Sequence, residues 1–368
     1  MAIVLFVGVL LTCFLLPSFL CIWQWKRPGL LDEPSASRLA SSIDLFIFLS
    51  TNHIYSLGLV HQGKCVGAMG GTAACKELVN GYYIIHEKGN ERAGYITNTY
   101  EVRYGFIATM DVYGFSLTPG QLVSYGSVWI ITDNGDAPAS SLEVFQIGWR
   151  VKPGDERPIF DLYCKMSDPS SPLTDPSHMD EDCPGFRPER GAYIRPGDPI
   201  PGISQPNGAK QYITLKVFKD MASGDWLVHY GFNNKDPELI GRIHLSFFKS
   251  LSYSAINIWF GGIVITNVTF QPTPLPPPMG SGYMTVDGGN MAASMKNLQF
   301  IDEQGRAWSA ENDLIGFSTN ENVYTFTSIV GDQFFYGGPF RQAILGAILR
   351  THVLYSFLLM FFFYYLFS

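Results

Sequence analysis

Two stretches of the sequence indicate β-strands that form the floor of a site: Val144-Phe145-Gln146-Ile147-Gly148-Trp149 and Trp259-Phe260-Gly261-Gly262-Ile263-Val264. Side chains alternate between the two faces of a β-strand, so Gln146 shares a face with Gly148, and Ile263 shares one with Gly261. Each glycine leaves room beside the central side chain. Such a hollow suits the floor of a site better than it suits a packed core.

Alternating apolar and polar residues recur from residue 104 onward, separated by turn clusters. Residues 213–217 alternate, a loop at 220–224 follows, and residues 226–230 and 243–247 alternate again. Further strand-like runs lie near residues 104–112, 122–132, 142–151, 158–164, 296–301 and 323–329. No amphipathic helix longer than two or three turns is evident among them. The sequence therefore predicts an all-β protein, an antiparallel sandwich or barrel.

The composition fits a strand-rich protein and argues against several function classes. The 368 residues include 37 glycines, 19 tyrosines and 27 phenylalanines, and only 15% of them are charged. The net charge of −7 argues against a nucleic-acid partner, because phosphate backbones need clustered Lys and Arg. The sequence has no Gly-x-Ser-x-Gly elbow, no His-Glu-x-x-His helix and no phosphate-binding glycine loop. We expect no cofactor and no metal site.

Short runs spread over residues 100–340 together resemble one known family. They are Tyr104-Gly105 with Ala108-Thr109, Gln146-Ile147-Gly148-Trp149, Cys183-Pro184-Gly185-Phe186, Gln211-Tyr212, Gly224-Asp225-Trp226, Trp259-Phe260-Gly261-Gly262, Met279-Gly280-Ser281-Gly282 and Phe335-Tyr336-Gly337-Gly338-Pro339. In this order and at this spacing the set resembles the neprosin-type catalytic domain, a plant family of secreted glutamic endopeptidases that cleave after proline. The resemblance implies an antiparallel β-sandwich of two sheets with a long cleft on one concave face.

The chain departs from that family at both catalytic positions. The family patterns are Glu-x-Gly-Trp and Gly-Gly-Glu, and here Gln146 and Ile263 stand where the resemblance places the two catalytic glutamates. Neither side chain can cycle a proton, and losing one acid–base group costs roughly 10²- to 10⁴-fold in rate. Glu143 lies three residues before Gln146, so strand parity sends it to the opposite face. We therefore assign no catalytic residue and expect a protein that is silent as a peptidase and at most binds peptides.

The resemblance also indicates which residues line the cleft and what the cleft accepts. The cleft candidates are Gly148, Trp149, Trp259, Gly261 and Gly262. A proline-containing peptide or a cell-wall protein is the expected partner. Two alternatives stay open: an active proline-specific glutamic endopeptidase with relocated carboxylates, and a lectin-like module that binds polysaccharide through cleft aromatics.

The N-terminal segment directs the chain to the secretory route. Residues 1–22 read as a signal peptide or an uncleaved signal anchor. Residues 23–99 form a leading segment that matches no activation peptide of the family, and the neprosin-like domain is expected over residues 100–340. These features predict an extracellular or cell-wall protein.

An apolar C-terminal tail, residues 341–368, follows the expected domain. Its unbroken part, Val353 to Phe367, is 15 residues, or about 22 Å as a helix, which is short for a bilayer core of ~30 Å. A lipid-anchor signal, a tail anchor and a tail without natural function all stay open. Membrane association through either terminus is therefore an expectation.

Two covalent features follow from the secretory reading. Of the six cysteines, four lie beyond the leader, and these four permit three pairings. The simplest arrangement pairs Cys164 with Cys183 around an acidic loop, and Cys65 with Cys75 in the leading segment. The sequon Asn267-Val268-Thr269 predicts a glycan, and parity along the strand gives Asn267 the same face as Ile263, near one end of the cleft.

Overall fold

The computed structural model describes residues 74–79, 82–87, 89–97, 102–132, 143–166, 183–251, 256–287 and 289–338. The chain divides into two units, Met1–Val60 and His61–Ser368, and every described residue belongs to the second. The predicted leader, most of the leading segment and the apolar tail lie outside the described residues. Within the ranges that are described, no helix has the length and apolar character needed to cross a membrane. Anchoring through either terminus stays a prediction.

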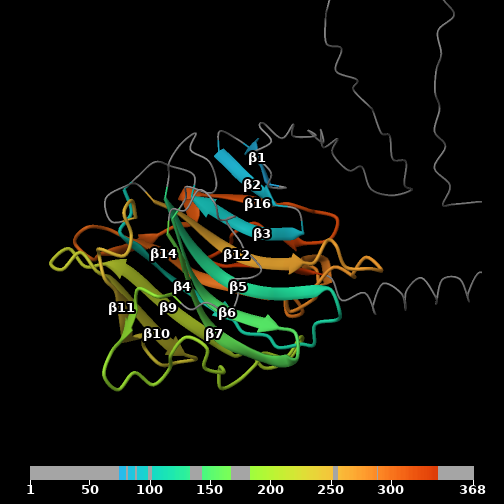
Figure 1. The fold of residues 1–368 in the computed structure, drawn as a ribbon, viewed down its shortest axis with the longest axis horizontal. Helices are drawn as coiled ribbons and strands as arrows, with labels where there is room; N and C mark the ends of the chain where they lie inside the picture. The colour runs from blue at the N-terminus through green and yellow to red at the C-terminus, as the bar shows by residue number, and fades with distance from the viewer. Residues whose placement is uncertain are drawn as a thin grey trace, which may run out of the picture. The chain divides into compact units, whose positions relative to one another are not determined.

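One sheet has six strands, each antiparallel to its neighbours (Figure 1). In order across the sheet they are β16 (Leu314–Ser318), β3 (Asn90–Thr97), β12 (Ile256–Thr266), β5 (Gln121–Thr132), β6 (Val144–Lys152) and β7 (Asp155–Lys165). The order brings together segments that are far apart in the sequence, since β3 lies between β12 and β16. Both stretches that opened the sequence analysis, in β6 and β12, therefore belong to this sheet.

The second sheet has ten strands, also antiparallel. Eight form a continuous path: β13 (Met279–Gly280), β18 (Phe334–Gly338), β14 (Ala293–Ile301), β4 (Gly105–Asp111), β9 (Tyr212–Lys219), β10 (Trp226–Phe232), β11 (Glu238–Ile243) and β8 (Phe186–Pro188). Two short strands branch from this path, β15 (Ala307–Ser309) on β14 and β17 (Thr325–Phe326) on β18.

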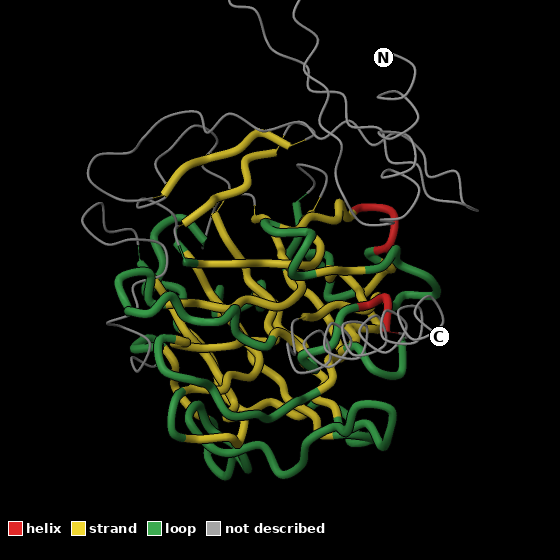
Figure 2. Tube along the Cα trace, turned by 90° about the vertical axis from the view of Figure 1, so that its right-hand side faces the viewer, coloured by secondary structure: helices red, strands yellow, loops and turns green. Residues whose placement is uncertain are grey.

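The remaining regular structure is small. Strands β1 (Ala74–Val79) and β2 (Tyr82–Glu87) pair as a separate two-stranded sheet. In the part of the chain that the structure describes, the helical segments are the short 3₁₀ turns η3 (Thr285–Asp287) and η4 (Glu311–Asp313), drawn red in Figure 2. The predicted all-β class is confirmed.

Apolar side chains from both large sheets meet in one core. Phe106 of β4 packs edge-on against Phe260 of β12, with ring centroids 5.9 Å apart, and Phe160 of β7 meets Tyr230 of β10 at 5.1 Å. Edge-to-face aromatic pairs add about 0.5–1.5 kcal/mol each beyond the burial of their area. Because these contacts join one sheet to the other, the predicted two-sheet sandwich is confirmed.

The expected domain boundary at residue 100 is too late. Strand β3 pairs with β12 along its whole length, and its Ala93 and Tyr95 side chains are in the shared core. The sequence hides this strand because Gly94 interrupts the apolar alternation and the strand begins with polar Asn90. The sandwich thus starts within the segment that had been assigned to residues 23–99.

Two predicted strands are shorter than their patterns indicate. The run at 243–247 ends as a strand at Ile243, because the Asp225 carboxylate accepts the N–H of Leu245 at 3.1 Å and a turn follows. The run at 323–329 forms a strand only at Thr325–Phe326. In both places side-chain or turn hydrogen bonds compete with the sheet ladder.

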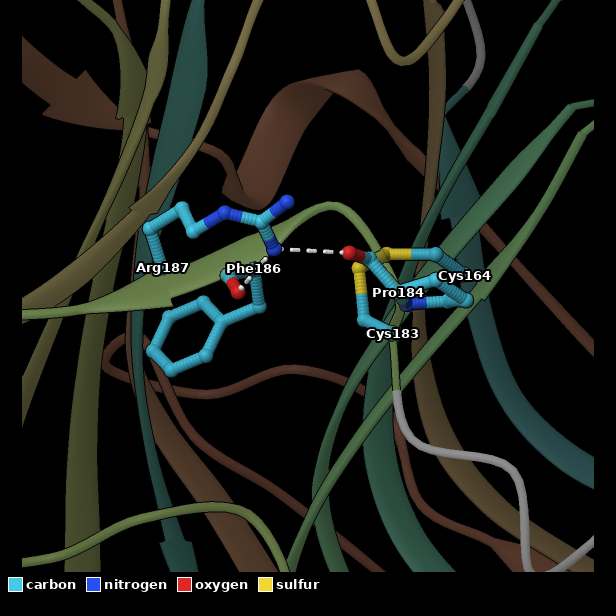
Figure 3. The surroundings of a disulfide bond; sticks show 5 residues. All are labelled: Cys164, Cys183, Pro184, Phe186 and Arg187. Atoms are coloured by element: carbon cyan, nitrogen blue, oxygen red, sulfur yellow. Dashed lines mark hydrogen bonds between the residues drawn. A yellow bond between two sulfur atoms is a disulfide. The ribbon is translucent and has the colours of Figure 1, made fainter.

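A disulfide joins Cys164 to Cys183, with Cα atoms 4.6 Å apart (Figure 3). Cys164 lies in β7 of the six-stranded sheet, and Cys183 precedes β8, the last strand on the path of the ten-stranded sheet. The N–H of Cys183 also donates to the carbonyl of Leu162 at 3.2 Å. The predicted pairing of these two cysteines is confirmed, whereas the pairing of Cys65 with Cys75 lies outside the described side chains.

A buried carboxylate closes the end of β4. Asp111 is 4% exposed and accepts hydrogen bonds from the N–H and the hydroxyl of Ser294, both at 3.0 Å. Burial raises the pKa of Asp111, and the nearby Lys210 charge opposes that rise without cancelling it. The folded protein therefore holds this proton more tightly than the unfolded chain does.

Replacing Asp111 by Asn should reduce the pH dependence of stability. Because the folded pKa of Asp111 lies above its unfolded value, the group favours folding at low pH, and this contribution is lost as the pH rises through the folded pKa. Urea unfolding of wild-type protein and D111N between pH 3.5 and 7 measures the difference. We expect the stability of D111N relative to wild type to increase with pH across this window. A constant difference contradicts the assignment.

Candidate functional site

The register of the six-stranded sheet places Gln146 and Ile263 on one face, with β5 between their strands. Gln146 lies opposite Trp129, which lies opposite Trp259. Four residues further along each strand, Arg150 lies opposite Tyr125, which lies opposite Ile263. We call the side of the sheet that carries these rows the Gln146–Ile263 face. It is directed away from the core between the two sheets, because the alternate residues of these strands fill that core.

Between these two rows runs a row of small residues. It consists of Gly94, Gly261, Ser127 and Gly148, which are opposite one another on β3, β12, β5 and β6. A Cβ atom on Gly148 would collide with the backbone of Gly126 and Ser127, so a glycine is required there by close strand approach. The parity that the sequence predicted for the two glycines agrees with this register.

Two indoles fill the hollow that the small row was expected to leave. A Cβ atom on Gly261 would lie 3.0 Å from Cζ2 of Trp259, and the Trp129 indole N–H donates to Ser127 Oγ at 3.0 Å. The two rings pack edge-on with centroids 6.1 Å apart, and they are only 2% and 3% exposed. The expectation of an open floor therefore needs correction, since tryptophan side chains cover it.

Three cleft candidates lie on the Gln146–Ile263 face, and two do not. Gly148, Trp259 and Gly261 share this face. Trp149 points into the core between the sheets, where its indole N–H donates to the carbonyl of Asp111 at 2.9 Å. Gly262 also faces that core, and its lack of a side chain admits Met279 and Tyr336 of the other sheet. Both residues pack between the sheets. Each is the immediate neighbour in its strand of a residue on the Gln146–Ile263 face, and adjacent residues of a strand point to opposite faces.

Gln146 touches a carboxylate that the sequence analysis did not assign. Asp161 of β7 lies opposite Gly148, and its Oδ2 accepts a hydrogen bond from Gln146 Nε2 at 3.4 Å. Its Oδ1 forms an ion pair with Arg150 Nε at 3.0 Å, and the two side chains are 5% and 8% exposed. Over residues 123–131, 144–150, 159–165 and 259–265, Asp161 is the one carboxylate on this face.

The buried charges on this face affect the tyrosine beside Ile263. Tyr125 lies between Ile263 and Arg150 and is 6% exposed. Burial, followed by the negative charge of Asp161, raises the pKa of Tyr125, while Arg150 acts in the opposite direction. Tyr125 therefore stays neutral and is suited to donating a hydrogen bond rather than to accepting a proton.

A second arginine lies at the other end of the same row. Arg92 of β3 lies opposite Ile263, and its guanidinium carbon is 5.2 Å from the centroid of a Trp129 ring. Arg92 is 7% exposed, so the aromatic ring provides a favourable environment for a charge that is largely removed from water. The face thus combines buried cations, aromatic rings and one paired carboxylate.

A turn signal in the sequence could have located Asp161. Lys152-Pro153-Gly154-Asp155 joins β6 to β7, and Pro followed by Gly is typical of a tight turn. Counting back from this turn along both strands places Asp161 opposite Gln146, and the register shift between Arg150 and Lys152 moves it opposite Gly148, on the same face. Only carboxylates close to Gln146 and Ile263 in sequence were considered, and so this cross-strand neighbour was missed.

Glu143 is oriented as parity predicts, away from Gln146. It is 0% exposed, and its carboxylate accepts the N–H groups of Lys249, Ser250 and Leu251 at 2.8, 2.7 and 2.8 Å. Three charge-assisted hydrogen bonds fix it to the chain before β12. Glu143 is therefore a structural group and takes no part in the Gln146–Ile263 face.

The sequon lies beyond the strand to which parity was applied. Strand β12 ends at Thr266, and its ladder with β5 shifts register between Ile265 and Thr266. Asn267 follows in a turn, where its Oδ1 accepts hydrogen bonds from the N–H and hydroxyl of Thr269 at 3.0 and 2.8 Å. Strand parity therefore does not extend to Asn267, and the sequon stays a candidate for glycosylation.

Metal chemistry finds no support in the side chains that are described. Within those ranges no three His, Cys, Asp or Glu side chains gather as they would around a metal ion. The polar groups of the Gln146–Ile263 face include an amide, two guanidinium groups, two phenols, a hydroxyl and a paired carboxylate, which favour hydrogen bonding over metal ligation.

The fold agrees with the family that the sequence matches. Residues 120–339 match the family model described as Neprosin, which covers more than half of the chain. The match and the two-sheet architecture define a peptidase-fold β-sandwich. More particularly, the chain belongs to the neprosin family.

Two solved structures are similar to this chain at low identity. Both are crystal structures of scytalido-glutamic peptidase, one with a transition state analog inhibitor and one with a peptide-based transition state analog. Each is 11% identical, and the alignment covers 68% of this chain and 98% of that chain, with TM-scores of 0.34 and 0.32.

Proposed function

We propose that this chain is a secretory-route member of the neprosin family that is silent as a peptidase and at most binds proline-containing peptides or a cell-wall protein. The observation that carries the proposal is the pair of residues on one face of the six-stranded sheet. Gln146 and Ile263 occupy the positions where the family resemblance places two glutamates, and Ile263 is 0% exposed. An extracellular or cell-wall location is proposed from the leader.

The chemistry of the Gln146 and Ile263 side chains supports the absence of peptidase activity. A glutamic peptidase needs one group to take a proton from water and another to donate one to the carbonyl and the leaving amine. Gln146 can orient a water molecule through its amide but does not accept that proton at a useful pKa. Ile263 has no polar atom in its side chain. The site retains hydrogen bonding and apolar contact, which are means of binding.

Asp161 is the one observation that favours the second candidate function, an active proline-specific endopeptidase with a relocated carboxylate. Its carboxylate is within 3.4 Å of Gln146 Nε2, so an active enzyme with a relocated carboxylate would use this residue. Against this, Asp161 already pairs with Arg150 at 3.0 Å in a buried setting. A carboxylate that is paired with a guanidinium is a weak base. In addition, residues 123–131, 144–150, 159–165 and 259–265 supply no second carboxylate on this face.

A lectin-like role for the aromatic residues of this face has less support. Polysaccharide binding needs an open ring face, whereas Trp129 and Trp259 are 2% and 3% exposed. Their rings pack against each other and over the small row. We therefore favour the proposal of a neprosin-family protein without peptidase activity.

Purified full-length protein should leave proline-containing peptides intact at acid pH. The assay incubates protein and peptide from pH 3 to 6 and follows products by mass spectrometry, with Asp161→Asn as the matched variant. Proline-specific cleavage by wild type that disappears in D161N, once circular dichroism has shown this variant to be folded, establishes the relocated-carboxylate alternative. Cleavage that persists in D161N contradicts both candidates.

Restoring one glutamate should not produce peptidase activity, since the reaction needs both proton-transfer groups. We expect no activity from Gln146→Glu alone, and activity only from the double change with Ile263→Glu. The double change also puts a carboxylate where an aliphatic side chain is buried, so a loss of roughly 1–3 kcal/mol in the free energy of unfolding accompanies it. The double variant is assayed with the same peptides after its folding has been checked by circular dichroism.

Protein made in a secretory host should carry a glycan on Asn267. Glycosidase treatment should then lower the mass of the wild type and leave Asn267→Gln unchanged. A wild type whose mass does not change on treatment argues against the secretory part of the proposal and leaves the peptidase assay unaffected.

A further inference from the structure

The outer side of the ten-stranded sheet carries lysines held above aromatic rings. In β9 the alternate residues Ile213, Leu215 and Val217 are in the core, so Tyr212, Thr214, Lys216 and Phe218 face outward. Lys216 Nζ lies 5.1 Å from the centroid of the Phe218 ring, and Lys296 Nζ of β14 lies 4.6 Å from that of Tyr212. The His229 ring of β10 stacks on Phe218 at 5.5 Å. We call Tyr212, Lys216, Phe218, His229 and Lys296 the lysine–aromatic face.

These five residues lie together because their strands are neighbours. The path β14-β4-β9-β10 is continuous, Lys216 lies opposite His229, and Lys296 lies opposite Thr109 of β4. Each of the five side chains is partly exposed, neither buried nor fully in solvent. A ligand can therefore reach them without a rearrangement of the sheet.

The two ammonium groups of this face lack carboxylate partners among the described residues. No Asp or Glu oxygen of those residues lies within 4.0 Å of the Lys216 or Lys296 Nζ atoms. The carboxylate nearest in register, Asp111, is hydrogen-bonded to Ser294 and lies 3.8 Å from Lys210. Burial and then the charge of Lys216 lower the pKa of His229.

We propose that the lysine–aromatic face binds a short acidic oligosaccharide of the uronate class, with one sugar carboxylate at each ammonium group. The rings hold both lysines over the sheet, so less side-chain freedom is lost when a carboxylate binds. Neutral hydroxyl groups of the sugar find Thr214 and Gln299 beside the lysines on the same outward side. The net charge of −7 opposes long polyanions and favours a ligand with few charges.

An extended acidic peptide fits this face less well. Strands β4, β9 and β10 are each hydrogen-bonded on both sides, so no strand edge is free to pair with a peptide backbone. A peptide lying over the sheet would leave its main-chain groups without such partners. A sugar chain needs only the side-chain contacts that the face supplies.

The test titrates full-length protein with digalacturonate, the dimer of galacturonic acid. Calorimetry gives the affinity, and the imidazole C–H resonance of His229, assigned with His229→Gln, reports the location. The double variant Lys216→Gln/Lys296→Gln should bind roughly tenfold or more weakly. The matched control is Lys249→Gln, which removes one exposed lysine in a loop and should leave the affinity unchanged.

The outcomes separate this proposal from its rivals. The methyl-esterified dimer should not bind, and raising the salt concentration should weaken binding of the acid. Absence of binding, an unmoved His229 resonance, or the same loss with Lys249→Gln overturns the proposal. Equal or tighter binding of a two-glutamate peptide overturns it in favour of an acidic-peptide site. None of these results bears on the peptidase proposal, which concerns the other sheet.

Discussion

Replacing Glu143 by alanine should lower the free energy of unfolding by about 3–4 kcal/mol. The Glu143 carboxylate is fully buried and accepts three backbone N–H groups, those of Lys249, Ser250 and Leu251. Without it, three N–H donors are left without an acceptor in a region that β6 and the chain before β12 enclose. An unsatisfied buried donor costs about 1–3 kcal/mol, and water entering the space left by the side chain would recover part of that loss.

Urea unfolding followed by tryptophan fluorescence measures this effect. The matched control is Glu303→Ala, because Glu303 is exposed and its carboxylate accepts one weak hydrogen bond, at 3.5 Å, from the neighbouring Gln304. We expect a change within about 0.5 kcal/mol for the control. A loss below 1 kcal/mol for Glu143→Ala would mean that the three N–H groups find other acceptors.

Replacing Asp161 by alanine should also be strongly destabilising, by about 3–5 kcal/mol. The change leaves the Arg150 guanidinium, 8% exposed, without the carboxylate that lies 3.0 Å from its Nε. A buried charge that loses its partner keeps its desolvation cost and loses the compensating attraction. Gln146 loses its acceptor at the same time.

A double-mutant cycle separates these contributions. The double variant Arg150→Met/Asp161→Leu removes both charges and should recover most of the loss, since a buried pair replaced by apolar groups is often nearly neutral. The pair Arg306–Asp302, at 2.7 Å with the Arg306 side chain 76% exposed, is the control, and Arg306→Ala should destabilise the protein much less than Asp161→Ala does. A double variant as unstable as Asp161→Ala would show that Asp161 acts through partners other than Arg150.

The strands with regular alternation were predictable from sequence. Residues 213–217 of β9 alternate without interruption, and their apolar members are in the core as expected. Strand β3 was not found, because Gly94 breaks its pattern and its partner β12 follows more than a hundred and fifty residues later. Local patterning reports on the face of a strand, while its partners are decided by contacts that span the chain.

The same distinction explains the site. Parity along β6 and β12 correctly gave Gln146 the face of Gly148 and Ile263 the face of Gly261. Trp149 and Gly262 were grouped with them because they are neighbours in sequence, although adjacent residues of a strand point to opposite faces. Asp161 lies on β7, the strand that pairs with β6, so it could be found only by working out which residues of the two strands lie opposite each other.

The position of β3 has a consequence for synthesis of the chain. This strand ends at Thr97, while its two neighbours, β12 and β16, begin at Ile256 and Leu314. At translation rates of about 5–20 residues per second, β3 waits for roughly 8 to 30 seconds before its first partner begins to be made. During that time both of its edges are unpaired, and unpaired edges are sites of aggregation. The charged Glu91 and Arg92 near its start and Gly94 at its centre make it a poor template for another chain, so the features that obscure β3 in the sequence also protect the nascent protein.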